Sequence, residues 1–246
     1  MRTHFFTLLL ITSFFSFADS ESVCGPDNRK PYQDMRIGRL EKADRSASCT
    51  VTLIGKSCVL SAGHCRPDVE KLVAFDVPPS KNGVLQPSRP ENNYEIDHSF
   101  IRSMDHVWGN DWMVLKLKAN KITGKLPGEV NGFYSISQDA PTAGEEIFIA
   151  GYGIDLRGDK SRHATLQIDR GRISSIKENA FGFKEISYSI DTEGGNSGSA
   201  IIRERTSEIV GIHTNGGECQ GSDLNFGTIV GATKKLRTAI SDCLAE

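Results

Sequence analysis

The stretch DTEGGNSGSA, from Asp191 to Ala200, surrounds one serine, Ser197, with small and turn-forming residues. A serine hydroxyl is a poor nucleophile unless a base removes its proton and dipoles receive the developing oxyanion. Glycines allow the backbone to turn so that the N–H groups of Gly195 and Ser197 can point into one small space. The stretch is therefore either the nucleophile turn of an enzyme or an ordinary glycine-rich turn.

A nucleophilic serine needs a histidine within reach, and His64 is the strongest candidate in this chain. It lies in LSAGHC, directly after an apolar run and beside Cys65, where a neighbouring disulfide would fix its position. The competing interpretation is a structural histidine with satisfied hydrogen bonds. Three further histidines lie in polar segments that we expect to be exposed: His98, His106 and His163.

A buried carboxylate should hold such a histidine in the correct tautomer. Asp111 opens the apolar run DWMVLKL, and a carboxylate at the start of a buried strand is costly unless it has a partner. Asp97 and Asp105 are the alternatives, although neither leads an apolar run. Asp111 is therefore the predicted third member of a catalytic group.

The first 18 residues read as a secretory signal peptide. A short cationic start precedes an apolar run from Phe5 to Phe17, and Ser16-Phe17-Ala18 is a small-x-small cleavage site. We expect a secreted or periplasmic protein, with residues 19–22 as a short pro-segment. The alternatives are a membrane anchor, for which the run is short, and a lipoprotein at Cys24, where ESVC carries a charge and a bulky valine.

Composition excludes several classes of function. The 246 residues contain 29 Lys and Arg against 31 Asp and Glu, and no basic patch points to nucleic acid. No later segment is long and apolar enough to anchor the mature chain in a membrane. Six cysteines in an exported chain predict three disulfides among fifteen pairings, and their spacing matches no zinc site. We expect no metal, no cofactor and a monomer.

Short apolar runs separated by Gly, Pro, Asn and Asp predict an all-β barrel or sandwich. One helix is expected from Ala232 to Leu244, where apolar residues recur at helical spacing. The polar segment from Lys118 to Gly132 is the expected hinge between a half spanning 23–125 and a half spanning 126–246. The expected strands are CTVTLI, CVLSA, KLVAF, WMVLKL, EIFIAG, ISYSI, SAIIR, EIVGIH and FGTIVG.

Three blocks, CTVTLIGKSCVLSAGHC, NDWMVLKL and DTEGGNSGSA, resemble in their order the catalytic blocks of trypsin-like (chymotrypsin-fold) serine proteases. The resemblance implies two six-stranded antiparallel β-barrels packed across a catalytic cleft, with a C-terminal helix. It implies a serine endopeptidase acting on proteins or peptides, with His64 as base, Asp111 orienting it and Ser197 attacking. The N–H groups of Gly195 and Ser197 would form the oxyanion hole. The alternatives are a catalytically silent binding module of this fold and a hydrolase of esters.

The same resemblance implies the disulfide pairing. Cys49 and Cys65 flank the histidine at the separation that the family uses for its histidine loop. The expected position of the C-terminal helix joins Cys58 to Cys243, which leaves Cys24 with Cys219.

Three further motifs, GGNSGS, GIHTNGG and VCGPDNRKPYQDMRIGRL, resemble bacterial glutamyl endopeptidases. In that branch a histidine, a threonine and the free N-terminal amine receive a substrate carboxylate, which here implies His213, Thr192 and Val23. A structural role for His213 in its strand is the other interpretation. Glu193 is expected only at the rim of the pocket.

Two residues near the serine set limits on this resemblance. Asn196 stands where trypsin-like zymogens place an aspartate that pairs with the new N-terminus, so we expect another activation route. Asp191 lies six residues before Ser197, where trypsin holds the aspartate that selects Lys or Arg. It would favour basic substrates if it lined the pocket, and otherwise would pair with His213 or an amine. The mature N-terminus also stays open, because only residues 19–22 would separate the signal peptide from Val23.

Overall fold

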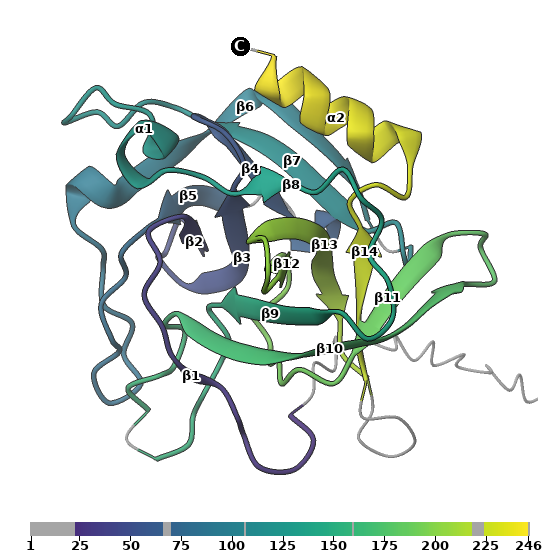
Figure 1. Ribbon diagram of the computed structural model, residues 1–246. Coiled ribbons are helices and arrows are strands. Elements are labelled where there is room, and N and C mark those ends of the chain that lie inside the picture. The colour runs from purple at the N-terminus through teal and green to yellow at the C-terminus, as the bar shows by residue number, and fades with distance from the viewer. Residues whose placement is uncertain (1–22, 66–69, 106, 159, 218–223, 246) are drawn as a thin grey trace, which may run out of the picture.

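The fold is described from a computed structural model, which covers residues 23–65, 70–105, 107–158, 160–217 and 224–245 (Figure 1). The predicted signal peptide and pro-segment lie outside the described residues, as do His106 and Cys219. Within the described ranges, no helix has the length and apolar character needed to cross a membrane.

The first half of the chain forms a closed antiparallel barrel in the order β2-β3-β4-β7-β6-β5. Val51, Leu60 and Leu115 are among the fully buried side chains of its core. A short 3-10 turn, η1 (Gly63–Cys65), follows β4. The strands are β2 (Ile37–Lys42), β3 (Ala47–Leu53), β4 (Cys58–Ser61), β5 (Glu70–Ala74), β6 (Asn93–Met104) and β7 (Trp112–Leu117), and the 3-10 turn η2 (Pro90–Asn92) precedes β6.

The second half forms another six-stranded ring, in the order β9-β10-β11-β14-β13-β12, which closes where β12 pairs with β9. The edge strand β1 (Lys30–Pro31) pairs with β10, and β8 (Ser135–Ile136) pairs in parallel with β13. The ring strands are β9 (Glu146–Gly151), β10 (Gln167–Glu178), β11 (Lys184–Tyr188), β12 (Ala200–Arg203), β13 (Glu208–Asn215) and β14 (Asn225–Ile229). The two-barrel fold that the resemblance implied is confirmed.

Residues 118–134 connect the barrels and contain the short helix α1 (Pro127–Asn131). This connection includes the predicted hinge, and the exact division of the chain at residue 125 stays a prediction.

The C-terminal helix α2 (Lys234–Leu244) packs on the outside of the first barrel, against β7 (Figure 1). It begins two residues later than predicted, because the Thr233 hydroxyl caps it by accepting a hydrogen bond from the Leu236 amide at 3.2 Å. The apolar stripe with Leu236, Ile240 and Cys243 is buried. A disulfide from Cys243 to Cys58 fastens the helix to β4 and confirms that predicted pair.

Candidate active site

His64 and Asp111 meet at the end of the first barrel. His64 lies in η1 directly after β4, and Asp111 directly precedes β7, which pairs with β4. The His64 Nδ1 and Asp111 Oδ2 atoms are 2.5 Å apart. Asp111 Oδ1 accepts hydrogen bonds from the amides of Gly63 at 2.6 Å and His64 at 3.1 Å. One carboxylate therefore fixes both the ring and the backbone of the histidine.

Asp111 is itself held from the second barrel. Its amide donates to the Thr228 hydroxyl on β14 at 3.0 Å, and its side chain is almost fully buried. A side chain on Gly63 would clash with this arrangement, because a Cβ there would lie 2.1 Å from the Met104 carbonyl oxygen and 2.9 Å from Asp111 Oδ1. The glycine of LSAGHC is thus required for the histidine and the carboxylate to approach.

The predicted Cys49–Cys65 disulfide is present and lies beside the histidine ring. A ligand atom of His64 and the two sulfur atoms all lie within 4.8 Å of one another. Because the sulfurs are joined, they offer no thiolate to a metal, and the group is a disulfide that borders the site. The Cys65 sulfur is also 3.9 Å from the carbonyl oxygen of Ser197, so the histidine loop and the serine turn are neighbours.

Ser197 lies in a tight turn between Asp191 and β12. The Ser199 amide donates to the Asn196 carbonyl at 2.9 Å, and the Asn196 amide donates to the Glu193 carbonyl at 2.9 Å. Gly195 and Gly198 both have a positive φ, of 99° and 87°. A Cβ at Gly198 would lie 2.1 Å from the Ser61 hydroxyl oxygen and 2.3 Å from the Thr50 carbonyl oxygen. Both glycines are thus demanded by the turn.

Thr50, on β3, is a residue that sequence reasoning missed. Its amide donates to the Ser197 carbonyl at 2.9 Å. Its hydroxyl donates to the Gly195 carbonyl at 2.8 Å and accepts from the Tyr152 amide at 2.9 Å. One threonine of the first barrel thereby holds the serine turn of the second. It stands two letters into CTVTLI, where an alternating strand pattern gives no sign of this role.

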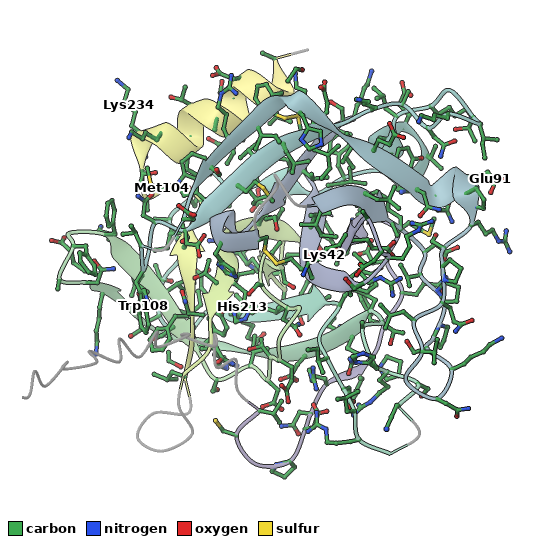
Figure 2. The ribbon with its side chains drawn as sticks, turned by 180° about the vertical axis from the view of Figure 1, so that it is seen from behind. Lys42, Glu91, Met104, Trp108, His213 and Lys234 are labelled. Atoms are coloured by element: carbon green, nitrogen blue, oxygen red, sulfur yellow. A yellow bond between two sulfur atoms is a disulfide. The ribbon has the colours of Figure 1, made fainter. Side chains whose placement is uncertain are left out.

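His213 is completely buried in β13, within the body of the molecule (Figure 2). Its Nδ1 atom is 2.7 Å from the hydroxyl of Tyr188 on β11, and that hydroxyl also donates to the Phe226 carbonyl at 3.1 Å. Tyr188 could not be recognised as a partner of His213 from the sequence.

Thr192 is also fully buried, and its hydroxyl has no hydrogen-bond partner among the described residues.

Asp191 binds Asn28, near the start of the described chain. Its Oδ2 atom accepts from the Asn28 amide at 2.8 Å and from the Asn28 side-chain amide at 3.0 Å. Its own amide donates to Asp169 Oδ2 at 2.9 Å. The structure thus pairs the Asp191 carboxylate with Asn28 of the N-terminal segment, and its pairing with a free N-terminal amine stays a prediction.

Two of the rival residues, Asp97 and His98, lie on β6. Asp97 is half-buried and accepts a hydrogen bond from the Ser99 hydroxyl at 2.7 Å, whereas His98 is exposed. His163 lies in the loop before β10, where burial lowers its pKa. Val23 is half-buried at the start of the described chain, and the predicted Cys24–Cys219 pair stays a prediction because Cys219 lies outside the described residues.

Comparison with known proteins agrees with this geometry. A family model described as trypsin matches residues 25–235. The chain is 28% identical over 191 residues to a glutamyl endopeptidase of Bacillus licheniformis, which covers 74% of this chain and 55% of that protein. It is 34% identical over 166 residues to a glutamyl endopeptidase of Staphylococcus aureus, covering 67% of this chain and 43% of that protein. The chain thus spans about half the length of the curated relatives that it matches.

Among solved structures, a Glu endopeptidase in complex with MPD aligns with a TM-score of 0.68 at 24% identity, covering 92% of this chain and 100% of that chain. A thermostable serine protease, AL20, aligns with a TM-score of 0.65 at 13% identity, covering 86% and 98%. These two likenesses support the fold. The chain belongs to the trypsin family. Within that family, the curated relatives that it resembles are named glutamyl endopeptidases.

Proposed function

We propose that this protein is an exported serine endopeptidase that works through His64, Asp111 and Ser197. The observation that carries the proposal is the contact of 2.5 Å between His64 Nδ1 and Asp111 Oδ2, in a trypsin-family chain whose GGNSG turn lies against the same disulfide. With Nδ1 held by the carboxylate, Nε2 is the nitrogen left to accept the serine proton.

The reaction proceeds by acyl transfer. Ser197 Oγ attacks the peptide carbonyl carbon as His64 takes its proton, and the amides of Gly195 and Ser197 stabilise the oxyanion. His64 then returns the proton to the leaving amine. Water hydrolyses the acyl-enzyme in a second cycle of the same groups, and the turn fixed by Thr50 supplies the rigid backbone that this chemistry requires.

A fluorophosphonate probe tests the proposed nucleophile. Ser197 should be labelled in the native chain, and His64→Ala should abolish labelling while the protein still folds. Ser197→Ala should lower peptide hydrolysis on the order of 10⁴-fold. Retained proteolysis by Ser197→Ala would end the proposal, and absence of labelling in the native chain would favour a silent binding module. Hydrolysis of esters but not of peptides would favour the esterase alternative.

The specificity that we propose is for Glu, and more weakly Asp, on the acyl side of the cut. A carboxylate entering a buried pocket needs donors to offset lost hydration. Thr192 can offer its hydroxyl, His213 an imidazole N–H and Val23 an amine. The Asn28 bonds to Asp191 support an acidic preference, because they occupy the carboxylate that would otherwise attract Lys or Arg.

The bond between Tyr188 and His213 supports the same assignment. The Tyr188 hydroxyl has one proton, and the Phe226 carbonyl can only accept it. When the proton is given to Phe226, the Tyr188 oxygen accepts from His213 Nδ1–H. A substrate carboxylate then binds best when His213 also carries a proton on Nε2, which makes the contact charge-assisted.

Cleavage of a peptide library by the purified protein, with its N-terminus sequenced, tests the specificity. We expect cuts after Glu. His213→Ala should reduce Glu turnover far more than it reduces reaction with a small fluorophosphonate, because the small probe makes no use of the pocket. A library dominated by cuts after Lys or Arg would assign specificity to Asp191 instead.

A further inference from the structure

Asp27, near the start of the described chain, contacts three arginines. Its Oδ1 atom accepts from Arg29 Nε at 3.0 Å and from the Arg29 amide at 3.1 Å. Its Oδ2 atom accepts from Arg157 Nη2 at 2.6 Å and from Arg162 Nη2 at 2.9 Å. The Asp27 side chain is only 8% exposed and that of Arg29 1%.

A second buried carboxylate, Asp155, completes the set from the loop between β9 and β10. It lies 3.1 Å from Arg157 Nε and 2.6 Å from Arg162 Nη2. Arg157 Nη2 also comes within 3.9 Å of Glu193 Oε1 in the serine turn. Asp27, Asp155 and Glu193 thus face three guanidinium groups. Asp27, Asp155 and Arg29 are buried, whereas the side chains of Arg157, Arg162 and Glu193 are 47%, 31% and 34% exposed. Replacing Asp27 would leave the buried Arg29 guanidinium without its ion pair, which is costly.

This charged set contacts the backbone that precedes the serine. Arg29 Nη1 donates to the Ile154 carbonyl at 3.3 Å, and the Ile154 amide donates to the Gly194 carbonyl at 2.7 Å. A Cβ at Gly153 would lie 1.9 Å from Asn196 Oδ1 and 2.6 Å from Arg29 Nη1, so the three residues pack with no room for a side chain. On the other side, Asn28 holds Asp191. Residues 27–29 thus hold the 191–196 segment in place at both of its ends.

These contacts of residues 27–29 matter because Asn196 cannot form the ion pair that orders the serine turn in trypsin-like zymogens. An asparagine has no charge to pair with an N-terminal ammonium, so another contact must hold the turn in its active shape. We propose that Asp27 is a positioning residue for the Ser197 turn, acting through Arg29, Arg157 and Glu193, and that it orders the turn without a free N-terminal amine. The inference rests on the proposed function, because it concerns the reactivity of Ser197.

The chain supplies a matched control. Asp34 and Arg36 form the same Asp-x-Arg arrangement as Asp27 and Arg29: the Arg36 amide and Nε donate to Asp34 Oδ1 at 2.9 Å each, and Nη2 donates to Oδ2 at 2.8 Å. Asp34 also accepts from the Tyr134 hydroxyl, which belongs to the connection between the barrels rather than to the serine turn. Asp34→Asn therefore removes a similar ion pair at a different place.

The experiment measures the second-order rate constant of the intact protein with a fluorophosphonate, together with kcat and KM on a peptide substrate. Asp27→Asn should lower the rate constant and kcat by roughly tenfold to a hundredfold, because a small displacement of the turn is enough to do so, while KM changes little. Asp34→Asn should leave the rate constant near that of the native chain. If Asp27→Asn fails to fold, Arg157→Lys keeps the charge, loses the fork of donors and should show a smaller loss of the same kind.

A second arm tests the N-terminus. Protein beginning at Val23 and protein that retains residues 19–22 should react with the fluorophosphonate at equal rates. Reaction of the Val23 form alone would overturn the inference, since the amine would then order the turn. Equal loss in Asp27→Asn and Asp34→Asn would also overturn it, by reducing Asp27 to a general stabiliser. A native chain that does not react at all would instead refute the proposed function.

Discussion

Thr50 bridges the two barrels at the point where they share the site. Its hydroxyl donates a hydrogen bond to the Gly195 carbonyl and accepts one from the Tyr152 amide. Thr50→Val preserves the shape of the side chain and leaves both partners without their bond. We expect a loss of about 1–3 kcal/mol in the free energy of unfolding.

We expect Thr50→Val to lower the reactivity of Ser197 as well, because the Gly195 peptide is part of the proposed oxyanion hole. Urea unfolding and fluorophosphonate kinetics measure the two effects. Thr50→Ser, which keeps the hydroxyl, should restore most of the reactivity. Full reactivity in Thr50→Val would show that the turn holds its shape without this bond.

Thr192 should behave in the opposite way. Its hydroxyl is buried without a partner among the described residues, which is costly in the free protein. Under the proposed specificity, this hydroxyl would donate to the substrate carboxylate. Thr192→Val should therefore leave stability unchanged or raise it by about 1 kcal/mol. Turnover of Glu peptides should fall by roughly tenfold, the effect of about one lost hydrogen bond. Lower stability with unchanged Glu turnover would assign the hydroxyl a structural role.

At the scale of single residues, the sequence predicted the groups whose chemistry is unusual for their place. His64 beside Cys65 and Asp111 before an apolar strand are examples, and the structure brings them into contact. Thr50 and Tyr188 could not be predicted, because each looks like an ordinary strand residue until its partner from a distant segment is known. The sequence holds one weak indication of the role of Asp27, because the Asp-x-Arg pattern of residues 27–29 recurs at residues 34–36 and 155–157.

Among the elements, α2 depends on its anchor. It has 11 residues, a length that is marginal for an isolated helix, and it is held by its buried stripe and by the Cys58–Cys243 disulfide. Replacing both cysteines by alanine should lower the free energy of unfolding by about 2–4 kcal/mol. Hydrogen exchange should show α2 opening before either barrel, while fluorophosphonate labelling of Ser197 persists. Uniform loss of protection across the chain would mean that the helix and the barrels unfold as one unit.

How well a strand could be predicted from the sequence depends on its burial. Those with continuous apolar runs were predicted well, and β7 matches WMVLKL residue for residue. Of the strands that form the two barrels, β2, β6 and β10 were missed, as were the two-residue strands β1 and β8. Most of β6 and β10 is exposed or half-buried, so hydrogen bonds to neighbouring strands define them rather than an apolar pattern. β2 is buried but carries Arg39 and Glu41, which form an internal ion pair at 2.6 Å. These two charged residues interrupt the apolar pattern, so the sequence did not indicate a strand there.

On the scale of the whole molecule, carboxylates paired with arginine set the response to acid. Burial raises the pKa of Asp27, Asp34 and Asp155, but the hydrogen bonds and charges of the neighbouring arginines outweigh it, and each pKa lies below its usual value. Such groups bind protons less readily in the folded chain than in the unfolded chain. Their contribution is fully present above the unfolded pKa of about 4 and is lost as pH falls through the folded pKa.

Two other carboxylates act in the opposite direction. Burial raises the pKa of Glu185, and it raises that of Asp169 with the neighbouring charge of Asp191 adding to the effect. Below their unfolded pKa, these two groups are protonated in both the folded and the unfolded chain. A further fall in pH therefore adds no stability from them, and they cannot offset the loss from the arginine-paired carboxylates.

We therefore expect the free energy of unfolding to decline steeply below about pH 4, where the arginine-paired carboxylates take up protons. Urea unfolding between pH 3 and pH 6 measures the slope. Asp27→Asn should begin less stable at pH 6 and fall less steeply, because one proton-binding site has been removed. Asp169→Asn, a matched change at a carboxylate of raised pKa, should keep the steep fall below pH 4. An equal slope for Asp27→Asn and the native chain would mean that Asp27 binds its proton alike in the folded and unfolded states, and that the arginine cluster does not govern the acid limit of the molecule.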